Sequence, residues 1–298
     1  LIQREALLLL RGKLLATMRH LAAFARRHRD TTVVGYTHFQ AAQFTTLGKR
    51  ACLWLQDLEE DLSHLDFLLA AWRLRGLKGA TGTQASFLAL LRTPARVARL
   101  EKLFLKKLGG FPAWPVTGQT APRKAESYLL AVLSGLAQSG HRFANDVRLL
   151  AHLGELSEPF GKDQVGSSAM PFKRNPIRSE RLTGLARYLI NLAPNASFTA
   201  AGQWLERTLD DSANRRLALP EAFLAADALL ELYGYLAVGI VAHPEVIATH
   251  TQEALPQIMM ENLLMKAVEN GADRQAVHEI LRTEALSWRP GRWPTPED

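Results

Sequence analysis

Apolar residues recur at steps of three or four positions through most of the chain, which is the spacing of one face of an α-helix. The clearest case is residues 41–76, where no proline interrupts the pattern. A helix of that length would extend roughly 54 Å, so we expect it to pack against comparably long partners. No convincing run of alternating apolar and polar residues indicates a strand. The apolar positions of this longest pattern are Ala51, Trp54, Leu58, Leu62, Leu65, Leu69 and Trp72.

Four further patterns predict long helices, at about residues 2–28, 121–153, 177–193 and 219–242. The last of them is apolar on nearly every side, which favours a place at the centre of a bundle that is shared between subunits. The fold that we predict is therefore all-α, an elongated bundle of long helices that oligomerises through them.

The character of the sequence changes near His243-Pro244. We expect a bundle domain at 1–242 to be followed there by the start of a smaller helical domain at 243–298. The residues from about 288 onward abandon the helical pattern and are predicted to be irregular. The chain begins directly in apolar periodicity, without a capping residue, so we expect it to be a piece of a longer protein.

Segments of a different composition separate the helical patterns. They are residues 31–40, 76–86, 117–120 and 161–176. The second combines hydroxyl and amide side chains with three glycines, which favours a tight backbone near a ligand. Its glycines are Gly76, Gly79 and Gly82.

Composition excludes several classes of protein. Hydrophobic residues make up 47% of the chain and charged residues 22%, and no stretch has the composition of a membrane span. Since the start also lacks the layout of a signal peptide, we expect a cytoplasmic protein that has no membrane partner. Cys52 is the single cysteine, which makes an internal disulfide impossible, and its helical position favours a small buried side chain. The histidines show no metal-ligand spacing, so we predict no metal and no cofactor.

The net charge of +7 suits an anionic partner, which could be a nucleic acid or an acidic metabolite. A group of basic residues lies along one apparent helix, with leucines interleaved. A solvated helix face is favoured over an RNA-binding stripe at this place, so we predict no nucleic-acid partner. The basic residues are Arg96, Arg99, Lys102, Lys106 and Lys107.

The segment 166–176 is the most informative part of the chain. It is a hydroxyl-bearing loop that leads into a helix, with Asn175 expected as the cap and Pro176 in the first turn. Backbone amides and the positive end of the helix would converge there on an anion, with Lys173 and Arg174 adding charge. A solvated basic loop in front of a helix is the alternative that these residues leave open.

This segment, Gly166-Ser167-Ser168-Ala169-Met170-Pro171-Phe172-Lys173-Arg174-Asn175-Pro176, resembles the signature loop of the fumarase, aspartase and argininosuccinate lyase superfamily. Further motifs narrow the resemblance to the adenylosuccinate lyases of the animal type, from about residue 1 to about 280. They are Gly35-Tyr36-Thr37-His38-Phe39-Gln40, Gly48-Lys49-Arg50, Lys78-Gly79-Ala80-Thr81-Gly82-Thr83-Gln84, Thr117-Gly118-Gln119-Thr120, Arg178-Ser179-Glu180-Arg181 and Glu206-Arg207-Thr208-Leu209-Asp210-Asp211-Ser212.

The resemblance implies an enzyme that splits fumarate from the succinyl-amino group of a purine nucleotide. Its substrates would be adenylosuccinate, which gives AMP, and the succinylated imidazole carboxamide ribotide of purine synthesis. Such an elimination needs a base for the carbon-bound proton and an acid for the departing nitrogen. By resemblance His38 is the acid and Ser167 is the base, with Ser168 as the alternative base. In isolation, a serine pair is more often part of a turn and a loop histidine is more often tied to backbone.

The same positional matching implies a set of binding residues. Lys173 and Asn175 would hold the carboxylates of the succinyl part, and Thr37 and Gln119 would contact the substrate near the reacting bond. Arginine suits the phosphate because its planar fork can bond two oxygens at once. The residues implied for the nucleotide are Arg181, Arg207, Ser212 and Arg216.

The family also implies a homotetramer whose active sites each draw on three subunits, and an N-terminal domain that is lacking here. We therefore expect this chain by itself to show little or no lyase activity. Ala41, Phe44 and Phe172 depart from the usual family residues, but none of them replaces a proposed acid or base. Two other interpretations remain. One is a sister lyase or a structural relative of the superfamily that has lost catalysis, and the other is a basic helical bundle that binds RNA.

Overall fold

The computed structural model describes residues 1–161, 170 and 172–287. Two of the predicted site residues, Ser167 and Ser168, lie outside the described residues, as does the predicted irregular tail from residue 288.

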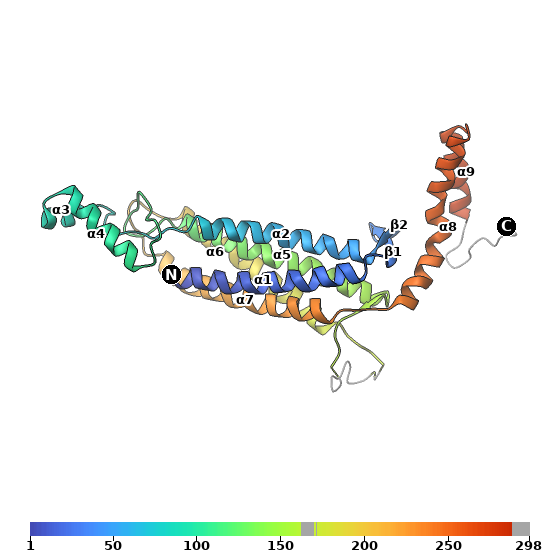
Figure 1. Cartoon of the computed structure of the whole chain (residues 1–298), viewed down its shortest axis with the longest axis horizontal. Helices are drawn as coiled ribbons and strands as arrows, with labels where there is room; N and C mark the ends of the chain where they lie inside the picture. The colour runs from blue at the N-terminus through green and yellow to red at the C-terminus, as the bar shows by residue number, and fades with distance from the viewer. Residues whose placement is uncertain (162–169, 171, 288–298) are drawn as a thin grey trace.

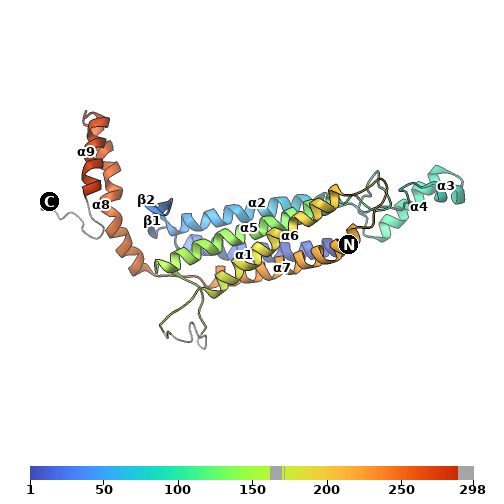
Figure 2. The ribbon, with the colours of Figure 1, turned by 180° about the vertical axis from the view of Figure 1, so that it is seen from behind.

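Long helices run back and forth along an elongated bundle (Figure 1). Two shorter helices, α3 (Ala85–Leu91) and α4 (Pro94–Lys107), project beyond one end of it. At the other end α8 (Pro244–Glu269) and α9 (Arg274–Ser287) form an arm that points away from the bundle axis (Figure 2). The bundle helices are α1 (Ile2–Arg27), α2 (Leu47–Ala70), α5 (Lys124–His152), α6 (Ile177–Ala201) and α7 (Asp211–Gly239).

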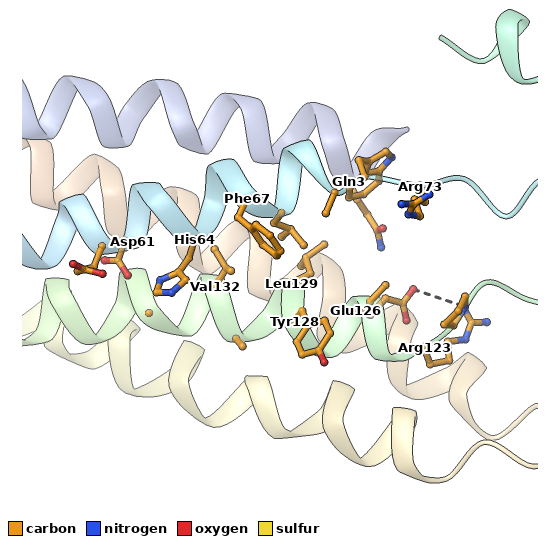
Figure 3. A pocket seen from close by; sticks show the side chains of 18 of the residues that line it. Gln3, Asp61, His64, Phe67, Arg73, Arg123, Glu126, Tyr128, Leu129 and Val132 are labelled. Atoms are coloured by element: carbon orange, nitrogen blue, oxygen red, sulfur yellow. Dashed lines mark ion pairs between the residues drawn. The ribbon is translucent and has the colours of Figure 1, made fainter. Parts of the chain in front are cut away.

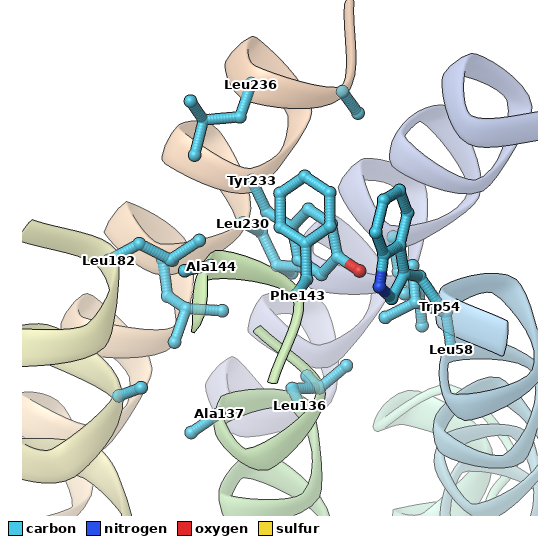
Figure 4. Close-up of a cluster of buried hydrophobic side chains, with 14 of the residues drawn as sticks. Trp54, Leu58, Leu136, Ala137, Phe143, Ala144, Leu182, Leu230, Tyr233 and Leu236 are labelled. Atoms are coloured by element: carbon cyan, nitrogen blue, oxygen red, sulfur yellow. The ribbon is translucent and has the colours of Figure 1, made fainter. Parts of the chain in front are cut away.

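A cluster of aromatic rings joins three of the bundle helices (Figure 4). Phe143 of α5 stacks on Tyr233 of α7 with 4.3 Å between ring centroids, and Trp54 of α2 meets Phe143 edge-on at 5.1 Å. The indole nitrogen of Trp54 donates a hydrogen bond of 2.7 Å to Asp146. Leucines and alanines extend this core along the whole bundle, so burial of the periodic apolar faces holds the helices together.

Four of the five predicted helices are confirmed, but two of these four are longer than the sequence indicated. Helix α6 continues past Pro194 to Ala201, and α7 begins at Asp211, well before Pro220. A proline inside a helix removes one backbone hydrogen bond and usually marks a boundary. Here the packing of α6 against α5 and α7 compensates for the lost bonds, and both helices run through their prolines.

The predicted helix at 41–76 is wrong at both ends. Its first residues belong to β2 (Gln40–Thr46), which pairs antiparallel with β1 (Thr32–Thr37), and the helix ends at Ala70. Thr46 caps α2, because its hydroxyl accepts a hydrogen bond of 3.0 Å from the amide of Lys49. A second, two-residue pairing joins β3 (Leu156–Ser157) to β4 (Val241–Ala242).

Two burial predictions are also corrected or qualified. Cys52 is exposed on α2, whose buried apolar residues include Ala51, Trp54 and Leu58. Helix α7 buries one side against α1, α5 and α6 but leaves Leu217, Leu224 and Val238 exposed. By length and composition α7 could also cross a membrane. However, 44% of its most apolar stretch is buried inside the bundle, which fits a helix that contributes to the core.

The basic residues of α4 lie on its solvent face, as predicted. Only Val97 of this helix is buried, and Thr93 and Pro94 begin it as cap and first residue.

Candidate active site

The hairpin between β1 and β2 ends in a two-residue turn made by His38 and Phe39. Both have positive φ, at 52° and 60°, where asparagine and glycine are the usual residues of such turns. Left-handed backbone at residues with a side chain costs on the order of 1 kcal/mol each and often occurs where function requires it. The turn exposes His38 together with the preceding Thr37. Both predicted site residues of this segment are therefore presented at one hairpin tip.

Buried charges hold the hairpin on the bundle. Glu155, which is 1% exposed, lies 2.9 Å from Nδ1 of His250 and 3.7 Å from the guanidinium of Arg50, and accepts a hydrogen bond of 3.4 Å from the hydroxyl of Tyr36. Arg50 also donates to the carbonyl oxygen of Val34 in β1 at 2.6 Å. Burial lowers the pKa of Arg50, against the attraction of Glu155, and burial raises the pKa of Tyr36. The carboxylate thus connects α5, the hairpin and the α8 arm.

The start of α6 differs from the prediction. The carboxylate of Glu158 accepts hydrogen bonds of 3.1 and 3.0 Å from the backbone amides of Arg178 and Ser179, so a side chain of the protein occupies the amides that were expected to bind a substrate anion. Pro176, and not Asn175, stands at the cap position. Glu158 thus accepts the hydrogen bonds of the free backbone amides at the start of α6, although it lies outside that helix. A search for capping residues next to the helix does not detect such a partner.

The predicted binding residues around this helix start are accessible. Lys173 and Arg181 are exposed and Asn175 is half-buried. The amide of Lys173 donates to the carbonyl oxygen of Met170 at 3.0 Å, which forms a tight turn just before α6. The structure therefore brings these three residues together along one short stretch.

Three connecting segments meet at the far end of the bundle. The backbone amide of Gln119 donates to the carbonyl oxygen of Glu206 at 2.9 Å, and a Cβ on Gly118 would lie 2.4 Å from the same oxygen. Gly82, with φ of +80°, packs so closely that a Cβ would lie 1.8 Å from the carbonyl oxygen of Thr117. The glycine-rich segment is tight, as predicted, but it is tight against the chain itself.

Replacing Gly82 with alanine is expected to destabilise the protein by at least about 2 kcal/mol, because the side chain adds a backbone clash to the strain of positive φ. The midpoint of urea unfolding measures the loss. Gly110→Ala is the matched control, since Gly110 has φ of +77° but no atom within 4 Å of the place that a Cβ would occupy. Equal losses for the two variants would contradict the clash.

A chain of charged side chains lies beside these segments. Nη1 of Arg207 donates a hydrogen bond of 2.7 Å to Asp211, and Nε of Arg123 forms an ion pair of 2.6 Å with the second oxygen of that carboxylate. Arg215 forms a two-pronged pair with Glu126, which also lies 3.6 Å from Arg123. Burial opposes the ionisation of Asp211, but Arg207 and Arg123 outweigh it and lower its pKa.

The other two predicted nucleotide residues lie in the first turns of α7. Ser212 is half-buried, and its amide donates to the carbonyl oxygen of Leu209 at 3.0 Å. Arg216 is exposed and lines a shallow apolar groove of about 490 Å³ between α1 and α7. Together with Gln119 and Arg207 they form the far-end group.

The predicted site residues therefore occupy three places. The hairpin tip and the start of α6 share one end of the bundle but lie on opposite sides of it, while the far-end group lies at the other end (Figures 1 and 2). Helix α6, which links the last two places, has 25 residues and extends roughly 37 Å. One copy of the chain does not bring the three groups together.

A groove of about 940 Å³ lies elsewhere, between α2 and α5 (Figure 3). None of the predicted site residues lines it, but its end reaches Arg123 and Glu126, beside the far-end group. Near its middle Asp61 accepts a hydrogen bond of 2.6 Å from Ser139, and burial raises the pKa of Asp61 to about 6. Within the described residues, no group of three His, Cys, Asp or Glu side chains gathers to hold a metal ion.

Sequence reasoning missed Glu155 and Asp211, which organise two of these places. Asp211 had a signal, since an acid with arginine four residues before and after it on a helix start can pair with either. Glu155 follows α5 in a short irregular stretch and meets Arg50 only through the fold. Its role could be found only from the structure.

Comparison with known families matches residues 3–190 to the family described as lyase. The match covers more than half of the chain. The chain belongs to this lyase family. This match confirms the resemblance to a lyase superfamily that the motifs indicated.

Individual relatives of the chain have narrower descriptions. The chain is 49% identical over 280 residues to adenylosuccinate lyase of Saccharomyces cerevisiae, covering 94% of the chain and 58% of that protein. It is 46% identical over 290 residues to adenylosuccinate lyase of Schizosaccharomyces pombe, covering 97% and 60%. The crystal structure of a fumarate lyase from Mesorhizobium sp. BNC1 superimposes with a TM-score of 0.80 at 24% identity, over 94% of the chain and 61% of that structure, which supports the fold. The chain thus spans about three fifths of the length of these proteins.

Proposed function

We propose that this chain is the central part of an adenylosuccinate lyase, which releases fumarate from adenylosuccinate and from the succinylated imidazole carboxamide ribotide. The observation that carries the proposal is the 49% identity to the yeast adenylosuccinate lyase over 94% of the chain. No cofactor is needed for such an elimination, because a base and an acid suffice for the two proton transfers.

The resemblance assigns a role to each of these residues in the elimination. Ser167, as the base, removes a proton from the succinyl carbon next to the carbon that bears the nitrogen. The electron pair of that C–H bond forms the double bond of fumarate as the carbon–nitrogen bond breaks. His38 gives a proton to the departing nitrogen, a task that suits an imidazole near neutral pH. Ser168 remains the alternative base. Lys173 and Asn175 hold the two carboxylates and Thr37 contacts the reacting end.

The nucleotide is proposed to lie against the far-end group and Arg181. Arg207, Ser212 and Arg216 approach its phosphate and ribose, and Gln119 lies closer to the reacting bond. Arg207 keeps guanidinium nitrogens beyond the one that is bonded to Asp211, so it can still bind phosphate oxygens.

A homotetramer is part of this proposal. The three places are too far apart in one chain to act on one small molecule, and neighbouring copies that pack along the long helices can bring different ends together. The exposed apolar residues Leu217, Leu224 and Val238 of α7 offer a surface for such packing. We also propose that the domain boundary lies at 242/243, where α7 gives way to the α8 arm.

The proposal is tested with the chain alone and with the chain substituted for the matching part of the yeast enzyme. We expect little turnover of adenylosuccinate by the chain alone and fumarate release by the chimera. Saturating AMP should also raise the free energy of unfolding of the chimera, by about 2.7 kcal/mol at 100 times the dissociation constant. A folded chimera without turnover would instead favour a relative that has lost catalysis, and salt-dependent RNA binding without AMP binding would favour the basic bundle.

A further inference from the structure

Asp211 is buried between two arginines that come from different segments. Its side chain is fully buried, while that of Arg207 is 22% and that of Arg123 10% exposed. Arg207 belongs to the connection between α6 and α7, and Arg123 stands at the start of α5. The carboxylate therefore links the segment that carries Arg207 to a different helix.

The position of Asp211 in the first turn of α7 offers a simpler explanation, since an acid there interacts favourably with the helix dipole. An exposed acid serves that purpose without the desolvation that burial of a charge requires. Asp210, the neighbouring acid, is exposed at the cap position and accepts a hydrogen bond of 3.1 Å from Thr208. Interaction with the helix dipole therefore does not explain why Asp211 is buried between two arginines while its neighbour is exposed.

The connection between α6 and α7 needs such a restraint. Leu205 has φ of 44° and is 97% exposed, and the neighbouring Trp204 is 74% exposed, so apolar packing contributes little to holding this turn. The amide of Arg207 donates to the carbonyl oxygen of Trp204 at 3.1 Å. The bond from Gln119 to Glu206 holds one side of the segment, and the contact of Arg207 with Asp211 holds the other.

We infer that Asp211 is a positioning residue, which holds the guanidinium of Arg207 in the orientation that receives the phosphate of a nucleotide. The inference rests on the proposed function, because it takes Arg207 as a nucleotide-binding residue. Asp211 accepts a hydrogen bond from Nη1 of Arg207. Because the guanidinium is planar, this one bond also fixes the directions in which its other N–H groups point. Because binding needs no new ordering of the side chain, affinity for the phosphate increases.

The test compares Asp211→Asn with Asp210→Asn, a matched change at the exposed neighbour, in the full 298-residue chain. Binding of AMP and of adenosine is measured by calorimetry for each variant. We expect Asp211→Asn to weaken the affinity for AMP at least tenfold and to change the affinity for adenosine less than twofold, because only AMP has a phosphate. Asp210→Asn should change neither affinity by more than twofold. Equal weakening of AMP and adenosine by Asp211→Asn would overturn the inference in favour of a general structural role.

A second measurement separates this inference from the proposed function. Absence of AMP binding by both the unchanged chain and the chimera described above would count against the proposed function.

Trypsin cleavage after Arg207, followed by mass spectrometry, needs no nucleotide. We expect Asp211→Asn to speed this cleavage severalfold and Asp210→Asn to leave it unchanged. Cleavage at the original rate in a folded Asp211→Asn variant would show that the carboxylate does not hold Arg207. If Asp211→Asn does not fold, Asp211→Glu, which keeps the charge but displaces the carboxylate, takes its place with the same expected outcomes.

Discussion

Replacing Glu155 with alanine is expected to destabilise the protein by about 3–5 kcal/mol, because the change leaves Arg50 as a buried charge without its acidic partner. Such a loss is a large fraction of the roughly 5–15 kcal/mol that stabilises a typical domain. The side chains of Tyr36 and His250 lose an acceptor at the same time. The midpoint of urea unfolding at constant slope measures the loss.

Hydrogen exchange should locate the effect of this change. Because Glu155 connects the hairpin and the α8 arm to α5, we expect the amides of β1 to lose protection before those of the aromatic core around Phe143. Glu253→Ala, at an exposed position of α8, is the control and should cost less than about 0.5 kcal/mol.

A double variant tests the physical reason. Glu155→Ala combined with Arg50→Met removes both charges and puts an apolar side chain in place of the arginine, so it should recover much of the loss. A cost below about 1 kcal/mol for Glu155→Ala alone would contradict the idea that this pair holds the hairpin.

The long helices could be predicted from the sequence because burial of an apolar face imposes its own period on the residues. Their ends could not be predicted where prolines were involved. The predicted boundaries at 193 and 219 stood next to Pro194 and Pro220, yet both helices continue through them. A local breaking signal was outweighed by packing along 25 to 29 residues of helix, which no short window of sequence contains.

The hairpin was missed for a different reason. Val33, Val34 and Tyr36 are typical strand residues, but the strands are short and the turn is made by His38 and Phe39 in place of asparagine and glycine. The pairing depends on the contact of β1 with α8, where Val34 packs against Ile258. That contact joins residues more than two hundred positions apart, so sequence patterns cannot show it.

The resemblance supplies a set of candidate site residues, but it does not say where they lie relative to one another. Motifs indicated His38, Lys173 and Arg207 by resemblance, and the structure puts them at three separate positions on the bundle. Nothing in a single sequence states whether two motifs meet within one chain or between chains. The supporting acids Glu155 and Asp211 became visible only when distances were known.

Loss of either proposed proton-transfer residue is expected to have the largest effect on activity. In the chimera with the yeast enzyme, His38→Ala and Ser167→Ala should each lower kcat by about 10²–10⁴-fold, the usual contribution of a positioned acid or base. The double variant should not lower kcat by the product of the two factors, because both residues act in one elimination. Phe39→Ala, next to His38 in the same exposed turn, is the control for the hairpin itself.

Mixing the two inactive variants tests whether a site draws on different copies of the chain. The hairpin of β1 and β2, which carries His38, lies on one side of the bundle end, and the start of α6 lies on the other. We therefore expect a site to take its histidine and its serine from different copies. Mixed assemblies of His38→Ala and Ser167→Ala chains then contain some sites with both residues intact, and activity should return well above that of either variant alone. The double variant mixed with itself contains no such site and should stay inactive. If the mixture remained inactive although both variants assembled together, the histidine and the serine would have to act from the same chain, and the proposed sharing of sites would be wrong.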